Sequence, residues 1–170
     1  MIIRKAHHMD YADVFRIGDE QLGENYMQGL LNPMDDNQIW LAIDQQSEQV
    51  VGFAYVIVKK KQATIKSIAI RSSFQNKGFG TKLINTALSE LQATVETFEV
   101  VTWERSDSQK IPIEKLLLNL GFKRSKTEVN YWFEDSLGSG YDCPSCGNPC
   151  RCNAVFFSSP SSCFAMNSGL

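Results

Sequence analysis

Residues 75–80 read Gln75-Asn76-Lys77-Gly78-Phe79-Gly80, a glycine-containing loop between two segments of different periodicity. The apolar run from Ile65 to Ile70 reads as a strand, and apolar residues recur at helical spacing from Thr81 to Ala93. A strand that leads through such a loop into a helix directs several backbone N–H groups toward one point, where the helix dipole adds partial positive charge. The sequence therefore predicts a pocket for a phosphate group.

The overall composition is that of an ordinary globular domain. Of the 170 residues, 43% are hydrophobic and 11% aromatic, which is enough for one buried core. Seventeen Lys and Arg against nineteen Asp and Glu give a net charge of −2, so we expect neither nucleic acid nor an anionic membrane as a partner. The first residues lack the apolar core of a secretory signal, and no apolar run is long enough to span a membrane. We expect a cytoplasmic protein.

Short apolar runs separated by turns predict the order of the secondary structure. Strands are expected at residues 2–6, 39–43, 49–58, 64–70, 98–103, 122–133 and 153–157, and helices at 10–17, within a broken segment over 18–37, at 81–93 and at 113–120. The short turns predict an antiparallel meander, and the helix at 81–93 predicts one parallel crossover pair.

The expected fold class is α/β (α+β), with a mixed, mainly antiparallel central sheet of about seven strands flanked by about four helices. One domain should span residues 1–158, and the Ser-rich residues 159–170 should form a disordered tail. We also expect the strand after Cys152 to lie at the edge of the sheet, where it could pair with a second copy and give a homodimer.

Three motifs follow one another along the chain at the ends of these elements. They are the strand end Ile68-Ala69-Ile70-Arg71, the loop from Gln75 to Gly80 and the later Leu120-Gly121-Phe122. In this order they resemble the GNAT superfamily of acetyl-CoA-dependent N-acetyltransferases, whose loop pattern is Arg/Gln-x-x-Gly-x-Gly/Ala. The resemblance covers residues 1–135 and the last strand. It implies a GNAT-like fold and the transfer of acetyl from acetyl-CoA to a primary amine of a small molecule or a protein.

The resemblance also implies which residues bind the co-substrate. The backbone of Ile68 and Ile70 would pair with the pantetheine arm, as a short added strand would. The pyrophosphate would be held by the backbone N–H groups of Gln75, Asn76, Lys77, Gly78, Phe79, Gly80 and Thr81. A side chain at Gly78 or Gly80 would occupy the space that the phosphates need. The cations Arg71, Lys77 and Lys82 could bind the other phosphate or be solvated surface charges.

Two residues depart from the family pattern at places where related enzymes often carry catalytic groups. Lys66 stands where a Glu is often found before the loop, and Leu117 stands where a Tyr often precedes the Gly-Phe pair. A base is still needed, because removing a proton from an ammonium of pKa near 10.4 at pH 7 costs about 4.6 kcal/mol. We nominate Glu104, at the carboxyl end of the next strand, where parallel strands separate. An exposed carboxylate paired with Arg105 is the alternative interpretation.

The acid that protonates the leaving thiolate is nominated in the same way. Tyr131 is our first candidate, and Tyr26 or solvent are the alternatives. The acceptor amine is expected near the broken segment over residues 18–37. There Tyr26, Met27 and the pair Asp35-Asp36 are possible contacts, although for the two acids we favour a solvated turn that caps the strand at Ile39.

Five cysteines fall within residues 143–163, and none precedes them. Four follow the pattern C-x2-C-x3-C-x-C and are Cys143, Cys146, Cys150 and Cys152. This clustering argues against disulfides across the fold, and four thiolates suit a tetrahedral Zn²⁺ with no open position, as in structural sites. The first turn resembles a zinc knuckle. Iron is an alternative by ligand type, and an unmetallated loop or local disulfides are another.

The main alternative to an enzyme is a non-catalytic module. Such a module would bind acyl-CoA and use the zinc loop to contact a partner. Lys66 and Leu117 favour it, because both replace groups that the family often uses in chemistry. Turnover with a panel of amines separates the two hypotheses.

Overall fold

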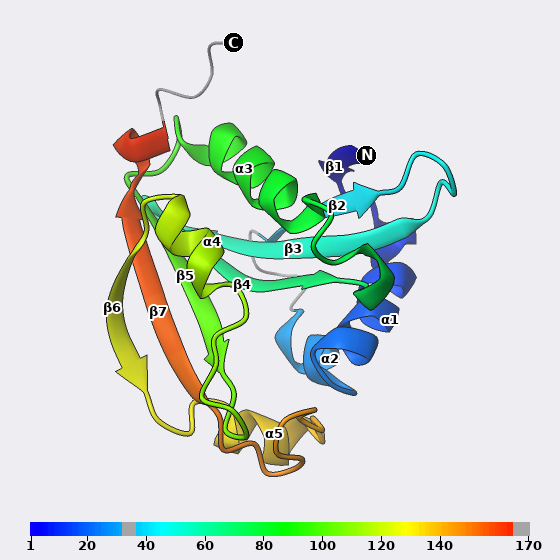
Figure 1. The fold of residues 1–170 in the computed structure, drawn as a ribbon, viewed down its shortest axis with the longest axis vertical. Helices are drawn as coiled ribbons and strands as arrows, with labels where there is room; N and C mark the ends of the chain where they lie inside the picture. Colours follow the sequence, from blue (N-terminus) through cyan, green and yellow to red (C-terminus); the bar gives the residue numbers. More distant parts are fainter. Residues whose placement is uncertain (32–36, 165–170) are drawn as a thin grey trace.

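The computed structural model describes residues 1–31 and 37–164, and these form a mixed α/β fold around one seven-stranded sheet (Figure 1). The strands are β1 (Ile2–Lys5), β2 (Asn37–Ile43), β3 (Val50–Lys59), β4 (Gln62–Ile70), β5 (Thr97–Glu104), β6 (Lys123–Glu128) and β7 (Asn153–Pro160). The α-helices are α1 (Tyr11–Gln21), α2 (Tyr26–Leu30), α3 (Phe79–Leu91), α4 (Glu114–Asn119) and α5 (Phe133–Ser139). Three 3-10 turns are η1 (His8–Asp10), η2 (Ser72–Phe74) and η3 (Ser161–Phe164).

The strand order across the sheet is β1-β2-β3-β4-β5-β7-β6. Neighbours are antiparallel throughout except for β4 and β5, which are parallel and joined by the crossover helix α3. The predicted fold class, the meander and the single parallel pair are therefore confirmed. The pairing follows from the connections, since short turns join antiparallel strands whereas a parallel pair needs a crossover.

The two parallel strands separate part-way along their length. Their pairing ends where Ile65 lies beside Val100, although β4 continues to Ile70 and β5 to Glu104. The register of β3 and β4 also shifts at this point, because Tyr55 pairs with Ser67 and Val56 with Ile65. Lys66 is thus the extra residue of a β-bulge, which bends a strand locally. Beyond the bulge, β4 keeps β3 on one side and opens a gap toward β5 on the other.

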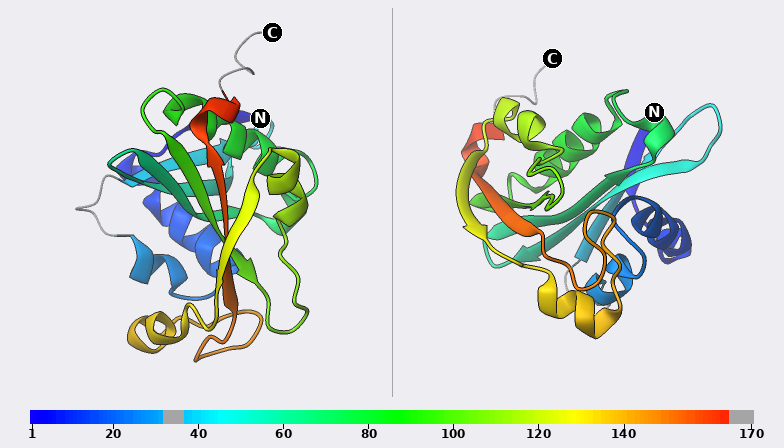
Figure 2. Two further views of the ribbon diagram at one scale, coloured as in Figure 1. Left: turned by 90° about the vertical axis from the view of Figure 1, so that its left-hand side faces the viewer. Right: turned by 60° about the horizontal axis from the view of Figure 1, so that its bottom comes forward.

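Helices cover both faces of the sheet and bury its two apolar surfaces (Figures 1 and 2). On one face α3 places Leu83, Ile84 and Leu88 against Val56 and Phe98 in the larger core. On the other face the buried side chains of α1 and α2 join a smaller core; they are Val14, Ile17 and Met27. The recurrence of apolar residues every three to four positions in α1 and α3 produces these single buried faces.

A third buried cluster lies at the bottom of the molecule in Figure 1, where α5 and the cysteine-rich loop cover the ends of β5 and β7. It joins Val101 of β5 and Phe156 of β7 to Trp132, Tyr141 and three buried cysteines. Trp132, Tyr141 and the three cysteines of this cluster belong to the long connection between β6 and β7. The connection is therefore a packed part of the fold.

The structure corrects three expectations at the C-terminal end of the chain. The strand predicted over 122–133 ends at Glu128, and Phe133 begins α5, a helix that we did not predict. The strand after Cys152 is not an edge strand, because β7 lies between β5 and β6. Residues 159–164 do not belong to the expected tail, because β7 continues to Pro160 and the Phe164 side chain of η3 is buried in the larger core; residues 165–170 lie outside the described residues.

Other boundaries differ by a few residues from those expected. The helix predicted over 10–17 extends to Gln21, and the helix predicted from Thr81 begins at Phe79. Asp10 precedes α1, but its carboxylate accepts hydrogen bonds from the Arg4 guanidinium and the His7 backbone N–H instead of capping α1. Among residues 1–31 and 37–164, no helix has both the length and the hydrophobicity needed to cross a membrane.

Candidate active site and metal centre

The predicted phosphate loop connects the far end of β4 to the first turn of α3. The Gln75 side chain fixes it, because its amide donates to the Ile70 carbonyl at 2.9 Å and to Gln21 Oε1 at 3.1 Å. Phe79 anchors the other end, since its ring is buried and packs edge-on against Phe74 with centroids 5.6 Å apart. The residues between them, Asn76 to Gly78, are exposed.

Six consecutive N–H groups of this loop are available to a ligand. Those of Asn76 to Thr81 donate to no acceptor within residues 1–31 and 37–164, and the first helical bond of α3 runs from Lys82 N to the Gly78 carbonyl. The seventh expected group, Gln75 N–H, donates to the Ser72 carbonyl at 3.3 Å instead. Unpaired N–H groups at the start of a helix can donate hydrogen bonds to an anion, and α3 has 13 residues.

The two glycines of this loop, Gly78 and Gly80, leave open space beside the backbone. Gly78 has φ +81°, a left-handed conformation that costs little only for glycine, and a Cβ there would meet no atom within 4 Å. At Gly80 a Cβ would touch only the Ile70 side chain, at 3.8 Å. Neither glycine is needed for packing within the chain, so the space beside both is open to a phosphate. An open hollow continues from Gly78 along the exposed side of α3, past Lys82 and Asn85.

The three cations considered for the other phosphate all have partners within the chain. The Arg71 guanidinium lies 3.5 Å from Glu20, and Lys77 Nζ lies 5.3 Å from the centre of the Phe74 ring. Lys82 Nζ donates to the Met1 carbonyl at 3.3 Å. These contacts agree with the interpretation of surface charges.

The gap between β4 and β5 is bordered by Lys66 and Tyr131. Lys66 Nζ donates to the Tyr131 hydroxyl at 3.4 Å, and the Tyr131 ring packs edge-on against Trp132 and Phe156. Tyr131 therefore reaches β4 from the connection between β6 and α5. Its phenol is placed beside the point where the two parallel strands separate.

Glu104, the last residue of β5, is not bonded to the residues that border this gap among those described. Its carboxylate accepts a hydrogen bond from Asn153 Nδ2 at 2.8 Å and lies 3.7 Å from the Arg124 guanidinium. The expected alternative partner, Arg105, instead binds Asp107. Along β5, Phe98 and Val100 belong to the core under α3 whereas Val101 belongs to the cluster under α5, so alternation places Glu104 on the α3 side. No contact joins Glu104 to Tyr131 within the described part of the chain.

The two positions that depart from the family pattern have structural roles. Leu117 is fully buried in the larger core, and Lys66 forms the β-bulge.

The pair Asp35-Asp36 lies outside the described residues. Glu24 forms an isolated bridge with Asp142, which brings the turn between α1 and α2 against the cysteine-rich loop.

Tyr26 marks the opposite side of the same gap. Its hydroxyl accepts a hydrogen bond from Ser67 Oγ of β4 at 3.2 Å, and its ring packs against Tyr141 with centroids 5.1 Å apart. Burial raises the pKa of Tyr26 to about 12, partly offset by its hydrogen bonds to Ser67 and Trp132. Sequence reasoning missed Ser67; the signal was a small polar residue within the run from Ile65 to Ile70, and it is buried in the structure.

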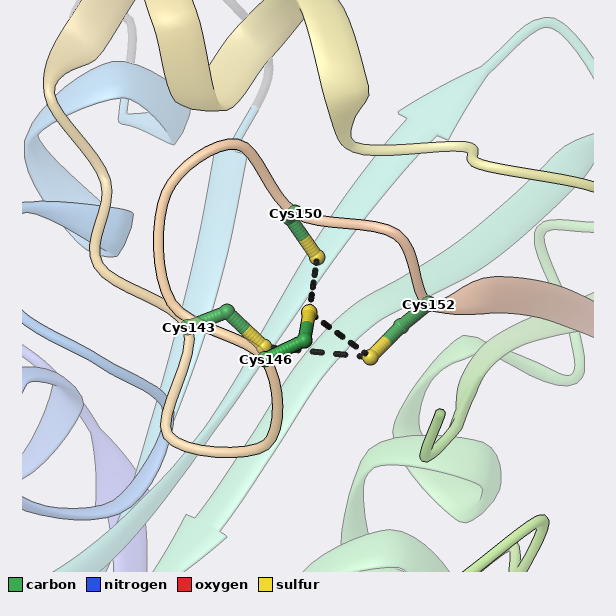
Figure 3. A group of neighbouring side chains, drawn as sticks. All are labelled: Cys143, Cys146, Cys150 and Cys152. Carbon is green, nitrogen blue, oxygen red and sulfur yellow. Dashed lines mark hydrogen bonds between the residues drawn. The ribbon is translucent and has the colours of Figure 1, made fainter. Parts of the chain in front are cut away.

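The four cysteines of the predicted metal site point toward one another (Figure 3). Their Sγ atoms all lie within 4.8 Å of one another, with separations of 3.8 Å for Cys143 and Cys152, 3.8 Å for Cys146 and Cys150, and 3.6 Å for Cys146 and Cys152. A tetrahedron with Zn–S bonds of about 2.3 Å has sulfur atoms about 3.8 Å apart. The four thiols are free, and their arrangement fits a tetrahedral ion.

The surroundings of the thiols also suit a metal site. Ser106 N–H donates to Cys152 Sγ at 3.4 Å and Arg151 N–H donates to Cys146 Sγ at 3.2 Å. The pKa of Cys143 is lowered to about 4, chiefly because the Cys150 thiol donates a hydrogen bond to it. The exposed Cys163 belongs to η3 and is not part of this cluster.

The cysteine loop, residues 143–152, and Tyr141 just before it are hydrogen-bonded to three neighbouring segments. Cys150 N–H donates to the buried Ser136 Oγ of α5, and Asn148 Nδ2 donates to the Ser136 carbonyl, both at 2.8 Å. The Tyr141 hydroxyl donates to the Leu22 carbonyl after α1. Ser145 Oγ accepts from the Asp107 N–H in the connection after β5. Ser136 was also missed by sequence reasoning, because α5 was not predicted.

A family model for the acetyltransferase (GNAT) domain matches residues 35–124, more than half of the chain. The chain belongs to the GNAT acetyltransferase family. The predicted resemblance is thereby confirmed. No curated relative matches the sequence.

Solved structures of GNAT enzymes share the fold of this family member. The ribosomal-protein-S18-alanine N-acetyltransferase from Escherichia coli is similar over 99% of this chain and 99% of its own, with a TM-score of 0.68 and 19% identity. The IAA acetyltransferase from Bacillus cereus covers 94% of this chain and 98% of its own, with a TM-score of 0.70 and 19% identity. A GNAT family acetyltransferase from Elizabethkingia anophelis with acetyl-CoA bound covers 94% and 97%, with a TM-score of 0.68 and 17% identity. At these identities the likeness concerns the fold.

Proposed function

We propose that this GNAT protein transfers acetyl from acetyl-CoA to a primary amine. The observation that supports it best is the combination of two features in the carboxyl-terminal half of β4 and the loop that follows it. The strand separates from β5 beyond Ile65, and the following loop presents six unpaired N–H groups at the start of α3. A pantetheine arm could pair with the free side of β4 at Ile68 and Ile70, while the loop from Asn76 to Thr81 holds the pyrophosphate.

The chemistry of the reaction sets what the neighbouring side chains must do. Acetyl-CoA supplies an activated acetyl carbon. A bond forms between that carbon and the amine nitrogen as the carbon–sulfur bond breaks, one proton leaves the nitrogen, and the thiolate takes up a proton. Tyr131, at the edge of the gap, is our proposed donor of that last proton.

Glu104 stays our prediction for the base, and its position makes a sharp test. Its carboxylate is bound by Asn153 and Arg124 on the α3 side of β5. If it accepts the amine proton, Glu104→Gln should lower kcat about 10²-fold or more. An unchanged kcat would exclude Glu104 as the base. Tyr131→Phe tests the acid in the same way, with the partly exposed Tyr11→Phe as control.

Acetyl-CoA binding can be tested directly by calorimetry with a matched pair of glycine variants. Gly78→Glu adds a negative side chain beside the proposed pyrophosphate site. Gly121→Glu is the control, because Gly121 also has a left-handed φ, at +87°, and open space at its Cβ, but lies between α4 and β6. We expect micromolar binding by the wild type and by Gly121→Glu, and none by Gly78→Glu. Absence of wild-type binding would overturn the proposal.

We further propose that the four cysteines bind Zn²⁺ as a structural ion. All four protein ligands are thiolates, so no position is left for substrate. A cytoplasmic location, which stays a prediction, would keep these thiols reduced. Metal analysis of the purified protein distinguishes zinc from iron.

The second candidate function is a non-catalytic acyl-CoA-binding module that uses the zinc loop to contact a partner. It is favoured by the burial of Leu117 in the core and by Lys66 in the bulge, since neither offers the catalytic group that related enzymes often have there. Acetyl-CoA binding without turnover of any amine in a broad panel would support this module. Acetylated product would rule it out.

A further inference from the structure

The β-bulge of β4 brings two consecutive polar side chains to the same face of the sheet. Lys66 Nζ donates to the Tyr131 hydroxyl, and Ser67 Oγ donates to the Tyr26 hydroxyl. Both tyrosines pack against the buried cluster under α5. Neighbouring side chains of a regular strand point to opposite faces, so the bulge is what allows β4 to contact both phenols.

Lys66 is a cation without an acidic partner. It forms no ion pair within residues 1–31 and 37–164. Its ammonium lies 3.4 Å from the Tyr131 hydroxyl and 6.0 Å from the centre of the Tyr131 ring. The side chain is only partly exposed, so water and salt screen its charge less than that of a fully exposed lysine. The charge therefore acts on the Tyr131 phenol and on a ligand in the gap beside it.

The hydrogen bond from Lys66 fixes where the proton of the Tyr131 hydroxyl can point. An ammonium group can only donate, so the phenol oxygen is the acceptor of this bond. The phenol must then direct its own proton away from Lys66. Since that proton has no acceptor in the described part of the chain, it is available to a group that binds in the gap.

The ring of Tyr131 is held by two aromatic neighbours. It packs edge-on against Trp132, with centroids 5.0 Å apart, and against Phe156 of β7, with centroids 5.7 Å apart. Both neighbours are buried. The ring position is therefore set by packing, and the hydroxyl orientation by Lys66, as a preorganised proton donor requires.

We propose that Lys66 is a positioning residue for Tyr131 during acetyl transfer. It directs the phenol proton into the gap and stabilises the phenolate that forms when Tyr131 protonates the leaving thiolate. The inference rests on the proposed acetyltransferase function. It also gives a use to the lysine that departs from the family pattern, because this residue would serve the acid and not the base.

The proton transfer follows the departure of coenzyme A. As the carbon–sulfur bond breaks, the O–H bond of Tyr131 breaks and an S–H bond forms on coenzyme A. The phenolate stays beside the Lys66 ammonium, which keeps its own proton, and regains a proton from water after the products leave. This ion pair exists only once the reaction has begun, so it should raise kcat without tightening substrate binding.

The test is a double-mutant cycle on acetyl transfer, with release of coenzyme A as the readout. The acceptor is the amine that the wild type acetylates fastest in a panel of amino acids, dipeptides and alkylamines. Lys66→Met removes the charge and the donor, Tyr131→Phe removes the phenol, and a third variant carries both changes. Lys66→Arg keeps the charge and the donors.

Lys5→Met is the control for the loss of a lysine. Lys5 Nζ also lies over an aromatic ring, that of Trp40 at 5.2 Å, but belongs to β1 at the edge of the sheet. Circular dichroism establishes that each variant is folded, and calorimetry compares the acetyl-CoA affinities.

We expect Lys66→Met to lower kcat about tenfold and to leave the KM for acetyl-CoA unchanged. In the Tyr131→Phe background the same change should alter kcat by less than about twofold, because no phenol is left to position. Lys66→Arg should keep kcat within about threefold of the wild type, and Lys5→Met should match the wild type.

Two results would overturn the inference alone. They are an unchanged kcat in Lys66→Met, and an equal loss from Lys66→Met whether or not Tyr131 is present. A wild type that acetylates no amine of the panel would instead reject the acetyltransferase, and the role of Lys66 with it. The two failures are distinguishable, because only the first leaves acetylated product.

Discussion

Ser136 offers a test of whether the cysteine loop is held by a metal. Its Oγ accepts a hydrogen bond from Cys150 N–H at 2.8 Å and donates one to the Phe133 carbonyl at 2.7 Å, and the side chain is fully buried. Ser136→Ala leaves the buried Cys150 N–H without its acceptor, which costs about 1–3 kcal/mol. In a protein of this size, a cost of about 2 kcal/mol lowers Tm by about 4–8 °C.

The cost should depend on the metal. If zinc fixes the loop, removal by a chelator releases Cys150 into water, where its N–H finds another acceptor. Chelation should itself lower Tm, since free zinc at about a thousandfold above its Kd stabilises by about 4 kcal/mol. In the chelated protein, Ser136→Ala should then cost less than about 0.5 kcal/mol. Chelation should reduce the free energy of unfolding more than it reduces the free energy of acetyl-CoA binding, because the phosphate loop lies at the start of α3 and not in the cysteine loop.

The assay is thermal unfolding of four samples, wild type and Ser136→Ala, each with zinc and with chelator. Ser139→Ala is the matched control on the same helix, because its Oγ donates to the Asp135 carbonyl and forms no hydrogen bond with the cysteine loop among the described residues. Equal costs of Ser136→Ala with and without metal would refute the coupling. An unchanged wild-type Tm in chelator, together with no zinc by metal analysis, would refute the metal site itself.

Two further predictions concern stability at other places in the fold. The Arg4 guanidinium lowers the pKa of Asp10 to about 2, so this contact stabilises the fold above the unfolded value near 3.9 and is lost as the pH falls through about 2. Urea unfolding should show that Asp10→Asn costs about 1–2 kcal/mol at pH 7 and progressively less below pH 4; a constant difference would contradict it. Phe164 is buried against Phe98 and Phe122, so Phe164→Ala should cost about 3–5 kcal/mol in the same assay. A loss below about 1 kcal/mol would contradict the packing of residues 159–164 against the core.

The phosphate loop was predictable because its information is local. The loop, the strand before it and the helix after it are contiguous in sequence, and Gly78 at φ +81° adopts a conformation for which glycine is the favoured residue. The four cysteines were predictable for the same reason, since ten consecutive residues contain all of them. Gln75 shows the limit of such reasoning: we expected its N–H to bind phosphate, whereas that N–H is used within the loop.

The elements that were missed depend on contacts distant in sequence or on the competition between two local signals. The aromatic pair Trp132 and Phe133 suggested a continued strand. The residues that favoured a helix instead were Asn130 before it, the acids Glu134 and Asp135 in its first turn, and Gly140 after it. In the structure Asn130 and Gly140 have the left-handed φ values of 52° and 70°. We also expected the strand after Cys152 at the edge of the sheet, but β7 pairs with β5 over its whole length and with β6 on its other side.

The relation of the proposed catalytic residues could not be read from the sequence either. Glu104 was nominated because it lies at the carboxyl end of a predicted strand, and Tyr131 was nominated as a phenol that could protonate the thiolate. Their separation depends on the face that each side chain takes, which alternates residue by residue. The bulge at Lys66 also shifts that alternation in β4, and a sequence pattern does not reveal it.

The position of β7 sets the order in which the chain can complete its sheet. Among the described strands, β6 has no neighbour other than β7, and β7 comes last along the chain. Strands β1 to β5 can pair during synthesis, whereas β6 must wait, with its charged side chains in water, until residues 153–160 emerge. We therefore expect a late folding step in which β7 enters between two strands and draws the cysteine loop closed behind it.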